Sequence, residues 1–114
     1  MINLILLATD GSAASEHATN YAASLATKYS AKVVVLHAFH ALPEHLGEPN
    51  YSKTMYRTLD QASAVTDKAV AALQAAGVAE VESEYVEGSP VDVILTAVNV
   101  RRPDVLVLGS RGLG

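Results

Sequence analysis

Hydrophobic residues form short unbroken runs that alternate with longer stretches of helical periodicity. Such runs cover residues 4–8 and 105–108, and residues 32–39 are dense in β-branched residues without polar alternation. A short apolar run without polar alternation is typical of a strand that is buried on both faces of a parallel sheet. Residues 81–87 alternate only in part and carry three glutamates, so they predict a more exposed strand near a sheet edge.

Two helices are predicted between the first three strands. The alanine-rich residues 13–29 follow Ser12, a candidate N-cap, and their apolar side chains recur at helical spacing. The second helix begins after Asn50 or Ser52 and ends at Gly77, a residue suited to the left-handed position that follows a helix. Each helix is therefore expected to connect two parallel strands.

The last predicted helix is short and amphipathic. Ser89 and Pro90 supply its N-cap and its first residue, and residues 101–104 end it. Its apolar stripe is expected to consist of Val91, Ile94, Leu95 and Val98.

This alternation of strands and helices predicts an α/β fold, a doubly wound parallel sheet with right-handed crossovers. If the acidic third strand lies outermost, the strand order is 3-2-1-4, and the winding reverses between the first and fourth strands. Ligands of such sheets lie outside the carboxyl ends of the strands at the reversal. Asp10 and Gly109 occupy those two ends.

A glycine turn, Gly109-Ser110-Arg111-Gly112, follows the fourth strand. Glycines allow positive φ angles and let backbone amides approach an anion closely. Ser110 offers a hydroxyl and Arg111 a charge-assisted fork, so a phosphate would fit this turn. The alternative is an ordinary helix-entry turn, and a G-x-x-G motif alone does not separate the two interpretations.

Asp10 is the second candidate for ligand contact. Its carboxylate can accept hydrogen bonds from sugar hydroxyls or a ring amine, or it can cap the following helix through an Asx-type turn. The residues alone leave both roles open. A histidine metal site is not expected, because His37 and His40 face opposite sides of their strand.

Composition narrows the classes of function. The formal net charge is -4 and no run of Lys and Arg interrupts it, which argues against a nucleic-acid-binding face. The chain has no cysteine, which is compatible with a reducing compartment, so a cytoplasmic location is expected. The apolar run Ile2 to Ala8 is too short for a signal peptide or a membrane helix, which predicts a soluble protein with no membrane partner.

Four segments in order resemble the universal stress protein family: ILLATDGSAASEHA, VVVLHAF, EGSPVDVIL and DVLVLGSRGLG. The resemblance covers essentially the whole chain. It implies a Rossmann-like fold of the adenine nucleotide alpha hydrolase-like kind. For the nucleotide-binding branch it implies that Asp10 contacts the nucleoside, that the backbone at Ala38 meets the adenine, and that Gly109 and Gly112 line the phosphates.

The expected function is that of a stress-response protein that senses or stores ATP, ADP or AMP, with Mg²⁺ or Mn²⁺ bridging the phosphates. No catalytic residues are assigned, because the sequence has no Walker lysine motif and no G-x-S-x-G elbow. Any ATP hydrolysis should be slow. The predicted nucleotide site consists of Ala8, Thr9, Asp10, Ala38, Gly109, Ser110, Arg111 and Gly112.

Two other classes of protein fit the sequence less well than a nucleotide-binding stress protein. A dimeric stress protein that binds no nucleotide and acts through protein contacts tends to lack the G-x-x-G turn, which this chain has. An enzyme of the ATP-pyrophosphatase type would need an S-G-G-x-D-S loop after the first strand, and residues 9–12 do not form one.

The family pattern continues after G-x-x-G with nine further residues and then Gly followed by Ser or Thr, whereas these 114 residues end two positions after Gly112. We therefore expect residues 1–114 to be a single domain that lacks the last helix and the fifth strand of the sheet. A longer native polypeptide is expected. In this family the fifth strand commonly forms the dimer contact, so the complete protein is expected to be a homodimer.

Overall fold

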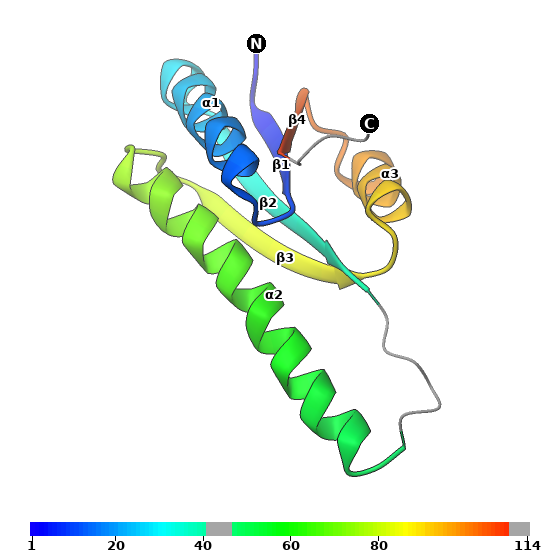
Figure 1. Cartoon of the computed structure of the whole chain (residues 1–114). Coiled ribbons are helices and arrows are strands. Elements are labelled where there is room, and N and C mark those ends of the chain that lie inside the picture. Colours follow the sequence, from blue (N-terminus) through cyan, green and yellow to red (C-terminus); the bar gives the residue numbers. More distant parts are fainter. Residues whose placement is uncertain (41–46, 110–114) are drawn as a thin grey trace.

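The structure, a computed structural model, describes residues 1–40 and 47–109. Within these residues the chain alternates four strands with three helices (Figure 1). Their bounds are β1 Leu4–Thr9, α1 Ala13–Tyr29, β2 Lys32–Phe39, α2 Asn50–Ala75, β3 Val81–Glu87, α3 Pro90–Arg101 and β4 Val105–Gly109. These bounds confirm the predicted elements, and β1 and β4 are each one residue longer than expected.

The described strands form one parallel sheet in the order β3-β2-β1-β4. The predicted α/β class and strand order are thereby confirmed. The chain leaves β1 toward β2 and later returns to the other side of β1 as β4, so the winding reverses between β1 and β4. β3 lies at the edge of the sheet and is largely exposed, as its glutamates predicted.

Helices α1 and α2 cover one face of the sheet and α3 lies on the other (Figure 1). Alternate residues of β1 and β2 therefore enter two different cores. The core on the side of α1 and α2 includes Ile5, Leu7, Ala22, Ala26, Val33, Val35 and Leu73. The smaller core under α3 consists of Leu6, Val34, Leu36, Val93 and Ala97.

The predicted burial of both faces holds for β1 and β2, whereas β4 lies at the sheet edge and has only one buried face within the described residues. Val107 is buried on the side that α1 covers, whereas Leu106 and Leu108 are 39% and 54% exposed. The reason is that α3 packs mainly against β2 and leaves this face of β4 uncovered within the described part of the chain. Within the described residues, this continuous apolar run is therefore an edge strand with one exposed apolar face.

The apolar stripe of α3 is rotated from its predicted position. Val91 and Leu95 are 55% and 57% exposed, and the buried residues of the helix are Val93 and Ala97. Since several sides of this helix carry apolar residues, periodicity alone did not define which one faces the sheet.

The predicted helix ends agree with the backbone geometry. Ser89 Oγ accepts a hydrogen bond of 3.3 Å from Asp92 N–H, and Pro90 is the first residue of α3. Gly77 follows α2 at a φ of +98°, the left-handed conformation that its sequence position predicted. Along the ranges that the structure describes, no helix is long and apolar enough to cross a membrane.

Candidate functional site

The ends of β1 and β4 meet at the carboxyl edge of the sheet. Thr9 is the register partner of Gly109, and Asp10 N–H donates a hydrogen bond of 3.1 Å to the carbonyl oxygen of Gly109. Ala8 lies one residue earlier, where it is buried between β2 and β4. The structure therefore brings together four of the predicted site residues on two neighbouring strands.

Ala38 lies near the end of β2, two residues beyond the last register pair of β1 and β2. Lys32 N–H donates to the β1 side at 2.9 Å and Val33 N–H to the β3 side at 3.0 Å. Because successive residues of a strand direct their backbone groups to opposite neighbours, Ala38 shares the direction of Lys32. Its backbone N–H and C=O are thus directed toward the end of β1, where Thr9 and Asp10 lie.

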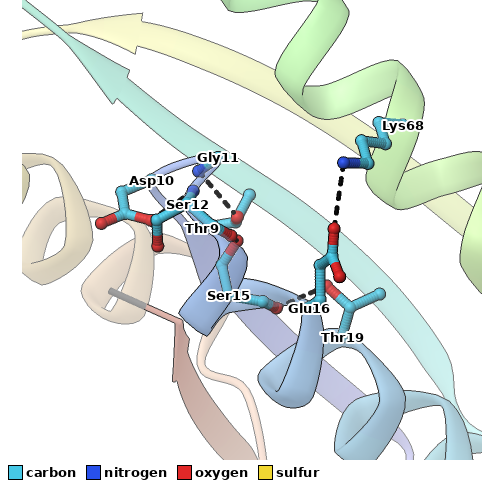
Figure 2. Close-up of polar contacts among 8 residues, drawn as sticks. All are labelled: Thr9, Asp10, Gly11, Ser12, Ser15, Glu16, Thr19 and Lys68. Atoms are coloured by element: carbon cyan, nitrogen blue, oxygen red, sulfur yellow. Dashed lines mark hydrogen bonds and ion pairs between the residues drawn. The ribbon is translucent and has the colours of Figure 1, made fainter. Parts of the chain in front are cut away.

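The β1–α1 turn is held by two side chains (Figure 2). Asp10 Oδ1 accepts a hydrogen bond of 2.9 Å from Ser12 N–H, which is an Asx turn, and Thr9 Oγ1 accepts one of 3.2 Å from Gly11 N–H. Gly11 has a φ of +79°. The Asx-turn role proposed for Asp10 is therefore present. A carboxylate can accept about four hydrogen bonds, so this turn is compatible with an additional contact to a ligand.

Ser12 stands at the N-cap of α1 as predicted, but its side chain makes no capping hydrogen bond. Instead its carbonyl oxygen accepts hydrogen bonds from Ser15 N–H at 3.0 Å and from Ser15 Oγ at 2.6 Å. Within the described residues, Ser12 Oγ is buried without a hydrogen-bond partner. Asp10 thus organises this turn more directly than the N-cap serine does.

Gly109 is required for a different reason than the one expected. Its φ lies outside the positive range, so backbone freedom is not what selects glycine here. A Cβ atom on Gly109 would lie 2.9 Å from the Cβ atoms of both Ser15 and Ala18. Helix α1 therefore packs directly on the end of β4. Ser110, Arg111 and Gly112, the rest of the predicted phosphate turn, lie outside the described residues.

His37 is a residue of this region whose contact the sequence did not predict. Its Nδ1 lies 2.8 Å from the carbonyl oxygen of Thr9. Because a carbonyl oxygen only accepts hydrogen bonds, Nδ1 carries a hydrogen atom and donates this hydrogen bond. The signal in the sequence was a single imidazole near the end of a strand that is otherwise apolar after Lys32.

Cavities beside the sheet include two that are lined by described residues. The first, about 400 Å³, lies between α1 and α2, which are joined by an ion pair of 3.1 Å between Lys68 Nζ and Glu16 Oε1 (Figure 2). The second, about 670 Å³, lies between β3 and α3. Of the predicted site residues in the described part of the chain, only Thr9 lines either one. Neither cavity outlines the predicted crevice.

Among the described residues, two carboxyl groups have lowered pKa values, and both lie away from the carboxyl ends of β1 and β4. Backbone hydrogen bonds from Asn3 and Leu4 lower the pKa of Asp104 at the amino end of the sheet. The hydrogen bond and charge of Lys32 lower the pKa of Glu82, and Arg101 contributes in the same direction. These shifts reflect structural contacts rather than chemistry at the carboxyl ends of β1 and β4.

Comparisons with known proteins agree with this arrangement. The chain is 35% identical, over its full length and 81% of the relative, to a universal stress protein of Thermus aquaticus encoded 3′ of a sulfhydrylase gene. A universal stress protein crystallised in complex with cAMP is 25% identical, with a TM-score of 0.73 over 93% of this chain and 75% of that one.

A universal stress protein family member of Arabidopsis thaliana, crystallised with AMP bound, has a similar fold. It is 22% identical, with a TM-score of 0.75 over 98% of this chain and 79% of that one. The model of the universal stress protein family matches residues 1–114. The chain therefore belongs to the universal stress protein family.

Proposed function

We propose that this protein binds an adenine nucleotide at the carboxyl ends of β1, β2 and β4 and acts as a stress-response regulatory or sensing protein. The observation that carries the proposal is the convergence of Asp10, the Ala38 backbone and Gly109 where the sheet reverses its winding. Loops diverge at such a reversal and leave room for a ligand. The relative with bound cAMP supports an adenine nucleotide as that ligand.

Each group suits a different part of the nucleotide. The backbone N–H and C=O of Ala38 can pair with the polar edge of adenine, and the Asp10 carboxylate can accept hydrogen bonds from ribose hydroxyls. The turn from Gly109 to Gly112 would then receive the phosphates, with Ser110 and Arg111 as further donors. Ala8 and Thr9, at the end of β1, would then lie beside the bound nucleotide.

A divalent cation is expected to tighten the binding of a triphosphate. Within the described residues, no group of three or more His, Cys, Asp or Glu side chains is arranged to hold a metal ion. We therefore expect Mg²⁺ or Mn²⁺ to arrive with the nucleotide, held mainly by phosphate oxygens. The role is one of binding, with ATP hydrolysis at most slow.

Calorimetric titration of the complete protein with ATP and Mg²⁺ tests this proposal. Saturable binding is expected, and Asp10→Ala should weaken it by about 1.5 to 3 kcal/mol, the contribution of a hydrogen bond to a charged group. Asp60→Ala, which removes an exposed carboxylate on α2, is the matched control and should bind like the wild type. Chromatography of ligand released by acid would identify the preferred nucleotide.

Absence of saturable binding at millimolar ATP and Mg²⁺ would favour the alternative, a stress protein that acts through protein contacts. A homodimer and a cytoplasmic location also stay predictions. Light scattering on the complete protein would test the first of them.

A further inference from the structure

The peptide group between Thr9 and Asp10 is hydrogen-bonded on both sides. Its carbonyl oxygen, which belongs to Thr9, accepts a hydrogen bond of 2.8 Å from His37 Nδ1–H. Its N–H, which belongs to Asp10, donates to the Gly109 carbonyl oxygen at 3.1 Å. In a trans peptide these two groups point in opposite directions, so this peptide plane is held from β2 on one side and from β4 on the other.

The contact from β2 comes from a side chain, although the sheet would ordinarily supply a backbone donor. The register of β1 and β2 ends at Ala8 and Leu36, one residue before Thr9. If the ladder continued, the Thr9 carbonyl would face the N–H of Ala38. The imidazole of His37 takes that place, so the Thr9 carbonyl is satisfied without the Ala38 N–H, which is directed toward the same end of β1.

We propose that His37 is a positioning residue of the nucleotide site: its Nδ1–H holds the Thr9–Asp10 peptide and thereby leaves the Ala38 N–H for the adenine edge. This inference rests on the proposed function, because it concerns how that site is kept ready for its ligand. His37 itself need not contact the nucleotide. The hydrogen bond keeps the ring of His37 in the Nδ1–H tautomer with or without ligand. Because the Thr9–Asp10 peptide is held in place, the Cα atom that carries the Asp10 side chain has a fixed position.

The first measurement uses the complete protein without nucleotide. Two-bond ¹H–¹⁵N correlation spectra of the ring are expected to show the Nδ1–H tautomer of His37. In the His37→Phe variant, hydrogen exchange of the Asp10 amide should accelerate about three- to tenfold, the effect of losing one ordinary hydrogen bond. An Nε2–H tautomer, or unchanged exchange at Asp10, would overturn the assigned hydrogen bond whatever the protein binds.

The second measurement is calorimetric titration with ATP and Mg²⁺. His37→Phe should bind about three- to tenfold more weakly than the wild type, and His37→Asn should bind within about twofold, because its amide nitrogen is attached to Cγ as Nδ1 is. His17→Phe, at an exposed histidine of α1, is the matched control. Wild-type affinity in His37→Phe, or equal losses in both His37 variants, would refute the positioning role.

Unfolding midpoints separate this role from a merely structural one. A structural histidine would lower the midpoint in His37→Phe and leave the affinity of the folded fraction unchanged, which would also refute the proposal. Failure of the wild type to bind nucleotide would instead refute the proposed function. The tautomer and the Asp10 exchange rate would then still decide whether His37 holds the peptide.

Discussion

Replacement of Gly109 by alanine tests how closely α1 packs on the end of β4. The added Cβ would lie 2.9 Å from the Cβ atoms of Ser15 and Ala18 and 3.0 Å from the Cα of Ser15. Carbon atoms in protein interiors ordinarily stay about 3.5 to 4 Å apart, so α1 must move by roughly half an ångström or more. Overpacking of this kind costs about 1 to 3 kcal/mol.

Urea unfolding monitored by circular dichroism would measure this loss. At about 4 °C for each kcal/mol in a domain of this size, the thermal midpoint should also fall by roughly 4 to 12 °C. The double variant Gly109→Ala with Ala18→Gly removes one of the close contacts, so it should recover part of the loss even though a helical glycine costs about 1 kcal/mol. The loss of stability in the double variant should therefore be smaller than the sum of the losses in the two single variants.

Gly77 provides a comparison in which backbone conformation, rather than space, selects glycine. Its φ is +98°, and the nearest atom to an added Cβ, Thr27 Cγ2, is 3.9 Å away. Asparagine tolerates the left-handed region better than alanine does, so Gly77→Asn should be the milder change there, whereas Gly109→Asn should be worse than Gly109→Ala. A change in stability below about 0.5 kcal/mol for Gly109→Ala would refute the packing argument.

Two further predictions concern Asp104 at the amino end of the sheet and the predicted glycine turn that follows β4. Hydrogen bonds from Asn3 and Leu4 lower the pKa of Asp104 below its ordinary value of 3.8. The ionised carboxylate therefore stabilises the fold above pH 3.8, and this stabilisation is lost as the pH falls through the folded-state pKa. Asp104→Asn should therefore have a lower urea midpoint than the wild type at pH 7, with the difference shrinking at pH 3; an equal difference at both values would exclude this linkage. Gly112→Val should abolish ATP binding in calorimetry with only a modest loss of stability, because a β-branched side chain would block the approach of phosphate; wild-type affinity in that variant would make the glycine turn purely structural.

The sequence by itself determined the elements, their order and the edge of the sheet where the candidate site lies. Short apolar runs, the Ser89-Pro90 start of α3 and the glycine after α2 are local signals, and each acts within a few residues of its own position. The acidic residues of β3 placed this strand outermost, which fixed the order of the sheet. That strand order predicted that Asp10 and Gly109 lie side by side at the carboxyl ends of β1 and β4.

Tertiary structure decided what depends on contacts between distant residues. The hydrogen bond from His37 to Thr9 joins residues 28 positions apart, and no local pattern encodes it. Gly109 suggested a flexible phosphate turn from its sequence context, but the close approach of α1 is what excludes a side chain there. Which side of α3 is buried, and which face of β4 is covered, likewise depended on where the neighbouring elements pack. Periodicity describes the faces of a helix or strand, whereas burial depends on which of those faces another element covers.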